Sequence, residues 1–158
     1  MDTSFNKILK YTDKEILLSW NDIDELVEVI CQKIKSKIDI HLEKYEIIAI
    51  TNGGIIPATI ISYNLGIKNI HLFPIINKKI IHNKIPILKT NKKYLLIDEI
   101  YDTGKTLKKT AKCLSFINHL DVFLIERYST VISNNHVYGR VLDDSRWVVF
   151  PWEGQHQQ

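Results

Sequence analysis

Short apolar runs alternate with stretches of helical length along most of this chain. The apolar runs, which we predict to be buried strands, cover residues 47–50, 70–76, 94–97, 122–125 and 147–150. The helical stretches cover Ser19–Ile38, Ile55–Leu65 and Thr106–His119. Because neighbouring parallel strands need a crossover connection, which is usually a helix, this alternation predicts a parallel α/β sheet flanked by helices.

Length and charge narrow the classes of function. The 158 residues suffice for one compact domain with a hydrophobic core and are too few for two. The chain has 21 Lys and Arg against 18 Asp and Glu, and its three arginines and scattered lysines form no basic cluster. Because proteins that bind nucleic acids by counterion release usually gather such cations on one face or tail, we expect no nucleic-acid partner.

The sequence carries neither a membrane span nor a secretion signal. No apolar run approaches the roughly 18 residues that a span needs, and the N-terminus lacks a basic region followed by an apolar one. Cys31 and Cys113 have no CxxC spacing and lie in apolar-periodic segments, which is typical of reduced, buried thiols. We therefore expect a cytoplasmic protein.

The segment Tyr94–Thr106 carries most of the chemistry, because an apolar strand there ends on two carboxylates and turns into a helix. Gly104 allows a tight turn, and backbone N–H groups at a helix start bind anions such as a phosphate monoester. Asp98 and Glu99 beside that cradle are suited to ribose hydroxyls or to the oxygen shell of Mg²⁺. A nucleoside-triphosphate P-loop is excluded, because Glu99 stands where that motif requires Gly.

Residues 96–106 resemble the phosphoribosyl-diphosphate (PRPP) loop of type I phosphoribosyltransferases. The resemblance implies that the acidic pair binds the ribose hydroxyls and that the loop binds the 5′-phosphate. It also places Asp102 near the purine N7, either as general acid or base or as a residue that recognises the base. The PRPP-binding residues implied in this segment are Asp98, Glu99, Asp102, Thr103, Gly104, Lys105 and Thr106.

A second segment, residues 50–57, resembles the pyrophosphate loop of the same family, and of its small purine-salvage members in particular. The resemblance implies that Asn52, Gly53 and Gly54 bind PRPP, with the paired glycines admitting backbone N–H groups to the diphosphate. Many members have Arg or Lys where this chain has Asn52. Without that cation, one charge-assisted hydrogen bond to diphosphate is missing.

A third segment, residues 146–153, resembles the C-terminal strand of xanthine and hypoxanthine-guanine phosphoribosyltransferases. The resemblance implies that Trp147 stacks on the purine, that the backbone of Val148 reads the ring edge, and that Glu153 lies near Mg²⁺ or the base. Asp98 and Glu99 are the other candidate metal ligands. Arg127 matches a Lys that donates to the purine 6-oxygen. Plain structural roles stay open for two of these residues: an interface aromatic for Trp147 and an ion-pair member for Arg127.

The resemblance implies a type I phosphoribosyltransferase fold, with a parallel-centred sheet, flanking helices and a small hood. We expect a single domain over residues 1–158, with a core at about 19–128 and a mobile loop within 77–91. The hood would comprise the N-terminal segment and about 129–158. Members of this family commonly form homodimers or homotetramers. Which lysine of the loop faces diphosphate stays open.

The implied reaction joins a purine base to PRPP, giving a nucleoside 5′-monophosphate and diphosphate with Mg²⁺ as cofactor. We expect a 6-oxopurine, namely hypoxanthine, guanine or xanthine, because the planar donors of Arg127 suit an oxo group. Two alternatives stay open. One is a PRPP- or nucleotide-sensing module of the same fold, which Asn52 favours; the other is a pyrimidine or orotate phosphoribosyltransferase.

Overall fold

Five parallel strands form the central sheet of the computed structural model, which describes residues 10–38, 41–128 and 135–154. The strand order is β4-β3-β7-β8-β9, and every pairing is parallel, as predicted. The strands are β3 (Tyr45–Ile50), β4 (Ile70–Phe73), β7 (Lys93–Tyr101), β8 (Asn118–Arg127) and β9 (His136–Leu142).

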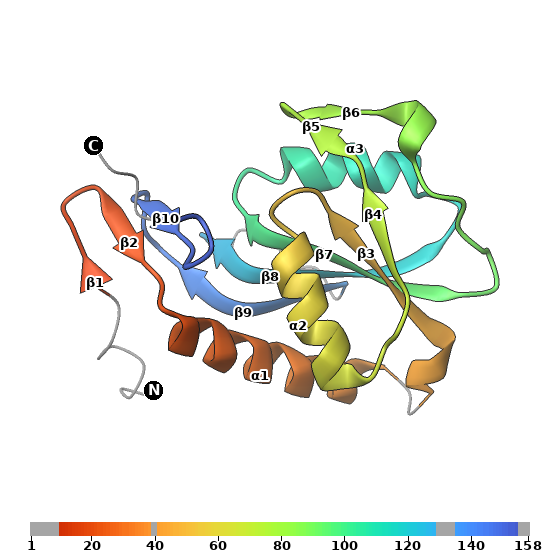
Figure 1. Cartoon of the computed structure of the whole chain (residues 1–158), viewed down its shortest axis with the longest axis horizontal. Helices are drawn as coiled ribbons and strands as arrows, with labels where there is room; N and C mark the ends of the chain where they lie inside the picture. Colours follow the sequence, from red (N-terminus) through yellow and green to blue (C-terminus); the bar gives the residue numbers. More distant parts are fainter. Residues whose placement is uncertain (1–9, 39–40, 129–134, 155–158) are drawn as a thin grey trace.

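Helices cover both faces of this sheet (Figure 1). On one face, α1 (Trp20–Lys37) and α2 (Ile55–Leu65) pack on the side chains of Ile47 and Ala49. On the other, α3 (Lys105–Cys113) and the turn that follows it pack on Ile48 and Ile50. Because successive side chains of a strand point to opposite faces, the continuous apolar run of β3 serves both cores.

α1 begins where the sequence predicted it, and a capping box fixes this start. Ser19 and Asp22 form a capping box, in which the Asp22 amide donates to Ser19 Oγ at 3.2 Å and the Ser19 amide donates to Asp22 Oδ2 at 2.6 Å. The expected end of α2 at Gly66 is also confirmed. The prediction for α3 was too long, because residues 118 and 119 already pair with β7 as the start of β8.

A separate three-stranded sheet joins the two ends of the described chain. β2 (Glu15–Leu17) pairs antiparallel with β1 (Lys10–Tyr11) and parallel with β10 (Trp147–Val149). Figure 1 shows this sheet beside the N-terminal end of α1. The strand expected at 147–150 therefore exists but lies outside the central sheet, and its first side chain, Trp147, is exposed rather than buried.

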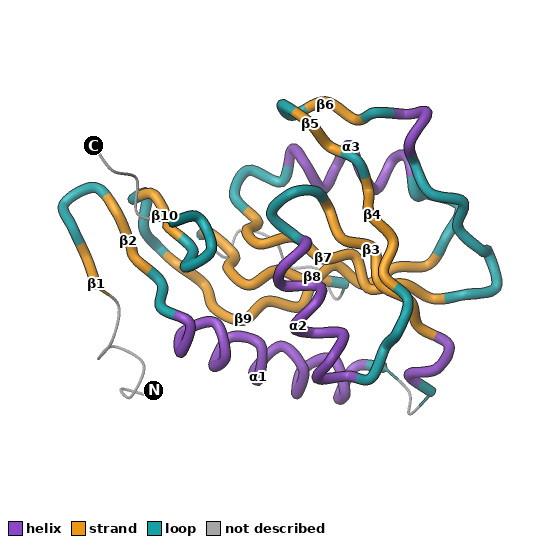
Figure 2. Tube along the Cα trace, viewed as in Figure 1, coloured by secondary structure: helices purple, strands orange, loops and turns teal. Residues whose placement is uncertain are grey.

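Two connecting segments contain short elements of their own. The polar stretch after β4 contains a hairpin of β5 (Ile75–Ile76) and β6 (Lys79–Ile80). A short 3₁₀ turn, η3 (His82–Lys84), follows the hairpin and leads into a long loop (Figure 2). The other short helical turn, η2 (Leu42–Lys44), leads into β3.

β9 is a strand of the central sheet that the sequence did not predict, and it lies within the residues expected to form the hood. Residues 129–134 lie outside the described part of the chain. Gly139 lies inside this strand, although glycine commonly forms turns. A Cβ there would approach the Leu124 carbonyl oxygen to 2.8 Å and the Leu26 side chain to 2.9 Å. The glycine therefore allows α1 to pack closely on β8 and β9. In the described residues, no helix is long and apolar enough to cross a membrane.

Candidate active site

A cavity of about 460 Å³ lies at the carboxyl ends of β7 and β8. In open α/β sheets this edge is where ligands usually bind. The cavity brings together most of the predicted PRPP-binding residues. Those among its lining residues are Asp98, Glu99, Asp102, Thr103, Gly104, Lys105 and Thr106.

The acidic pair lies within β7 rather than after it. β7 continues to Tyr101 because its last residues pair with β8, with Asp98 opposite Phe123 and Tyr101 opposite Glu126. The Glu99 amide donates to Asp98 Oδ1 at 2.8 Å. The pairing of β7 with β8 places both carboxylates on a strand, which holds them more rigidly than a loop would.

Both carboxyls of the pair titrate far above their usual range. Burial raises the pKa of Asp98 to about 7. Burial, the neighbouring Asp98 and Glu153 raise the pKa of Glu99 to about 7, against a lowering effect of the Trp152 hydrogen bond. Such perturbed groups in a cavity are typical of a functional site, because a bound cation or hydroxyl ligand would relieve the cost of their charge.

Gly53 and Gly54 bring the loop after β3 directly onto β7. A Cβ at Gly53 would lie 2.6 Å from the Glu99 carboxyl carbon, and a Cβ at Gly54 would lie 2.2 Å from the Ile97 carbonyl oxygen. No side chain fits at either position, so the backbone itself lies beside the acidic pair. Asn52 is exposed and is not among the cavity's lining residues; the Thr51–Asn52 peptide bond is cis.

The turn from β7 into α3 supplies the expected anion cradle. α3 begins at Lys105 on the cavity wall, and its first-turn N–H groups have no acceptor within the helix. Gly104 adopts a positive φ of 73°, as a tight turn requires. The hydroxyl of Tyr101 lies next to this glycine, at 2.5 Å from where a Cβ would be.

Arg127 lies beside Asp102 and is buried. Its Nε is 3.2 Å from Asp102 Oδ1, and its side chain is 8% exposed against 57% for Asp102. Nη1 donates to the carbonyl oxygens of Asp144 and, at 3.1 Å, of Arg146. Arg127 is therefore a member of an ion pair, as the structural alternative held, but its side chain is buried rather than on the surface. The guanidinium ties Asp102 to the segment that leads into β10.

The other predicted base-binding residues lie outside the lining of this cavity. Trp147 is 64% exposed on β10, and Val148 is buried opposite Ile16 of β2. Glu153 accepts a hydrogen bond from the Phe150 amide at 2.9 Å, and its charge reaches Glu99. The C-terminal segment therefore approaches the acidic pair through Glu153 and Trp152.

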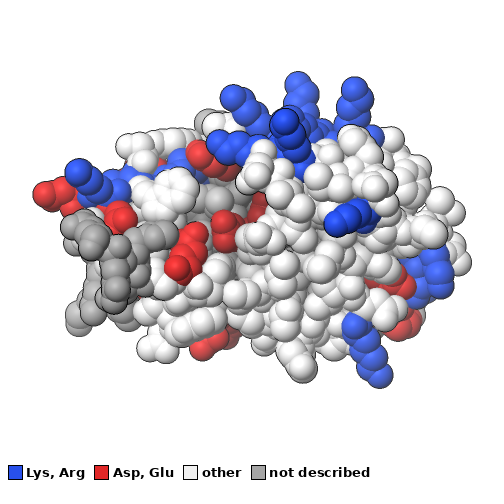
Figure 3. Space-filling view, turned by 45° about the horizontal axis from the view of Figure 1, so that its top comes forward, with Lys and Arg blue, Asp and Glu red and all other residues white. Residues whose placement is uncertain are grey.

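Several lining residues were not expected. Tyr101 and Phe123 were assigned to apolar or turn segments without a role, yet both line the cavity, with ring centroids 5.3 Å apart. Lys78 of the β5–β6 hairpin and Lys109 of α3 add cations. Figure 3 shows acidic side chains near the middle of one face and basic side chains along its upper margin. For Lys109 the sequence did hold a signal: it lies one helical turn after Lys105, so the two side chains share a face of α3.

The carboxylate pair fits Mg²⁺. Asp98 and Glu99 offer hard oxygen donors, and neither is in an ion pair with a cation of the described residues. The same part of the chain holds no group of three or more His, Cys, Asp or Glu that could enclose a metal by itself. Protein Mg²⁺ sites often use one or two carboxylates together with substrate phosphates, so a pair is enough.

Comparisons with known proteins found purine phosphoribosyltransferases of similar sequence and fold. No family model matches the chain. It is 23% identical over 154 residues to a xanthine-guanine phosphoribosyltransferase of Chromohalobacter salexigens, covering 89% of the chain and 85% of that protein. It is 29% identical over 124 residues to that of Desulfotalea psychrophila, covering 70% and 71%. A solved purine phosphoribosyltransferase of Pyrococcus horikoshii is similar at TM-score 0.68 and 25% identity, over 89% of this chain and 95% of that chain.

The parallel sheet, with its acidic pair and helix start at the carboxyl edge, defines a type I phosphoribosyltransferase fold, as predicted. The chain resembles the purine-salvage branch of that family.

Proposed function

We propose that this protein is a purine phosphoribosyltransferase that converts a 6-oxopurine and PRPP into the nucleoside 5′-monophosphate and diphosphate. One observation carries the proposal. The acidic pair, the helix start and Asp102 line one cavity. A phosphate, a sugar diol and a reacting base edge are the three parts that such a reaction must hold together.

Each part of PRPP would have a counterpart in the cavity or on the loop beside it. The 5′-phosphate would bind the N–H groups and hydroxyls at Thr103–Thr106, where α3 begins. The ribose hydroxyls would bind Asp98 and Glu99. The diphosphate would lie along the backbone at Gly53 and Gly54, where this loop packs directly against Glu99 and Ile97. Lys78 and Lys109 add positive charge for the diphosphate.

Asp98 and Glu99 would hold Mg²⁺, and the nearby charge of Glu153 would act on Glu99. When bound, the metal would neutralise charge on the leaving diphosphate. The protein's own contribution is to fix the two carboxylates on β7 and to present N–H groups to the departing anion. These groups stabilise charge that develops as the bond from ribose to diphosphate breaks and the bond to the base nitrogen forms.

Asp102 would hold or exchange the proton at the purine N7 while the hairpin at residues 75–80 excludes water. Trp147, the Val148 backbone and Arg127 would complete the base site. We further propose that the β1–β2–β10 sheet serves as the hood, that the loop within 77–91 moves over bound PRPP, and that the protein works as a homo-oligomer.

Arg127 is expected to act on the reaction through Asp102. It reaches Asp102 through Nε and two carbonyl oxygens through Nη1, two nitrogens held in one rigid plane, whereas Lys carries all its donors on a single nitrogen. Arg127→Lys should therefore lower kcat by about 10- to 100-fold, because a small displacement of a reacting group has effects of that size. Steady-state rates with hypoxanthine, guanine and xanthine, measured across pH, check this.

Arg140→Lys on β9 is the matched control, because it makes the same exchange outside the cavity lining. It should keep the wild-type rate. An Arg127→Lys protein with the wild-type kcat and pH profile would show that the ion pair does not position Asp102. A selective rise in KM for the oxopurines, at unchanged kcat, would instead assign Arg127 to base binding alone.

The proposed function is tested by incubating the protein with radiolabelled bases, PRPP and Mg²⁺. We expect nucleoside monophosphate and an equal amount of diphosphate from at least one 6-oxopurine. Turnover of adenine or orotate alone would contradict the substrate assignment. The double variant Asp98→Asn, Glu99→Gln is the negative control, because it removes both charges from the cavity.

One observation favours a second candidate, a PRPP- or nucleotide-sensing module of the same fold. Asn52 is neutral, exposed and outside the cavity lining, so no cation of that loop reaches the diphosphate position. A sensor would bind PRPP without releasing diphosphate in the presence of any base. Calorimetry of PRPP binding, run beside the diphosphate assay, separates the two functions.

A further inference from the structure

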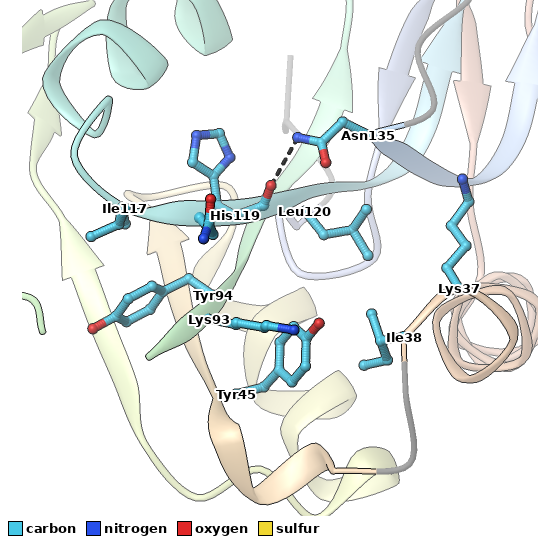
Figure 4. Close-up of a pocket in the computed structure, with 10 residues that line it drawn as sticks. Lys37, Ile38, Tyr45, Lys93, Tyr94, Ile117, His119, Leu120 and Asn135 are labelled. Carbon is cyan, nitrogen blue, oxygen red and sulfur yellow. Dashed lines mark hydrogen bonds between the residues drawn. The ribbon is translucent and has the colours of Figure 1, made fainter. Parts of the chain in front are cut away.

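A second cavity, of about 700 Å³, lies at the opposite edge of the central sheet, where the strands begin (Figure 4). It is formed by the end of α1, the first residues of β3, β7 and β8, and the residue before β9. Its lining residues are Lys37, Ile38, Tyr45, Lys93, Tyr94, Ile117, Asn118, His119, Leu120 and Asn135. The proposed reaction uses none of them.

The charge of this cavity differs from that of the first one. The first cavity is lined by three acidic and three basic residues, whereas the second has two lysines and no Asp or Glu among its ten lining residues. Figure 4 shows Lys93 next to the ring of Tyr45, and the Lys93 ammonium lies 5.8 Å from that ring's centroid. Cation and aromatic ring at one wall favour a ligand that is both anionic and planar.

Apolar and amide groups complete the walls. Ile38 and Leu120 face each other across the cavity in Figure 4. The Asn135 side-chain amide donates to the His119 carbonyl oxygen at 2.8 Å, which joins the start of β8 to the residue before β9. A volume of this size accommodates a nucleotide or another drug-sized molecule.

A buried polar and aromatic network connects the second cavity with the first. His119 Nδ1 is 2.7 Å from Asp121 Oδ1, and Asp121 Oδ2 is 3.5 Å from His136 Nε2. The His136 ring is 5.2 Å from the Tyr101 ring and 5.6 Å from the Phe123 ring, between centroids. Since His119 lines the second cavity and both aromatic residues line the first, the two cavities share one continuous packed unit.

We propose that the second cavity is an effector site for an aromatic phosphate monoester of nucleoside-monophosphate size. The phosphate lies by Lys93 and the ring against Tyr45. Occupancy changes the affinity of the first cavity through His119, Asp121, His136 and Tyr101. The coupling rests on the proposed function, because it requires PRPP in the first cavity, whereas binding at the second cavity does not.

Amide chemical shifts of the ¹⁵N-labelled full chain distinguish the two sites. Titration with AMP should shift the amides of residues 93 and 118–120, and titration with PRPP and Mg²⁺ should shift those of 103–106. Inorganic phosphate and adenosine, as separate probes, should each bind at least tenfold more weakly than AMP. AMP shifts confined to 103–106 would overturn the proposal, and absent PRPP shifts would instead contradict the proposed function.

Lys93→Met keeps the length of the side chain and removes its charge. It should weaken AMP binding at least tenfold and leave the PRPP shifts unchanged, whereas Lys112→Met, outside both cavity linings, should change neither. Equal AMP affinity in the two variants would refute the site. Saturating AMP should change the PRPP Kd of the wild type but not that of Lys93→Met, and PRPP should change the wild-type AMP Kd by the same factor. Independent binding of the two ligands would refute the effector role.

Discussion

Asp102→Asn is expected to lower kcat for a 6-oxopurine by about 10²- to 10⁴-fold, the usual contribution of a general acid or base. The amide keeps the shape of the side chain and a carbonyl oxygen toward Arg127 Nε, which lies 3.2 Å from the carboxylate in the wild type. It cannot take up or release the base proton at neutral pH. Pre-steady-state rates of nucleotide formation with saturating PRPP measure the effect.

The PRPP Kd of this variant should stay within a few-fold of wild type, because the phosphate cradle at Thr103–Thr106 and the acidic pair are untouched. Asp143→Asn is a matched control, since Asp143 is exposed and is not among the lining residues. If Asp102→Asn turned over at the wild-type rate, Asp102 would have no acid or base role. A parallel loss of PRPP affinity would assign it to binding.

The free energy of unfolding should fall by about 7 kcal/mol as the pH rises from 4 to 8, because of Asp98 and Glu99. The folded-state pKa of each is about 7, above the ordinary values of 3.8 and 4.5. Between the unfolded and folded values, the folded state keeps protons that the unfolded chain has released. The stability from these groups is therefore complete below about pH 4 and is lost as the pH rises through 7.

Urea unfolding at several pH values, in the absence of divalent cations, measures this dependence. Asp98→Asn should flatten the curve and make the protein more stable than wild type at pH 8, because one of two adjacent buried charges is gone. Asp24→Asn on the exposed side of α1 should leave the slope unchanged. Added Mg²⁺ should stabilise the wild type at pH 8 more than Asp98→Asn. A wild-type curve as flat as that of Asp98→Asn would contradict the raised pKa values.

Local patterns in the sequence were sufficient for the parallel sheet, the capped start of α1 and the acidic pair. These features depend on residues close together in the chain, such as Ser19 with Asp22 or Asp98 with Glu99. β9 was missed because the intrinsic turn preference of Gly139 conflicts with its packing role, which exists only once α1 lies on the sheet.

The contacts that the sequence did not predict depend on the register between strands that are distant in the chain. Nothing near Arg127 in the chain indicates that Asp102 and the carbonyl oxygens of residues 144 and 146 surround it. The same holds for Phe123, whose place at the cavity follows from its pairing with Asp98 across two strands. Partners that are 17 or more residues apart, as these are, are set by strand register, which single-sequence periodicity does not specify.

The small sheet makes the two ends of the chain interdependent. β2 lies between β1 and β10, so the backbone that carries Trp147 and leads to Trp152 is hydrogen-bonded to residues 15–17. Trp20 at the start of α1 also packs against Trp152, with ring centroids 5.9 Å apart. An amino-terminal truncation, tag or fusion is therefore a change to the surroundings of Glu99, even though some 80 residues separate them along the chain.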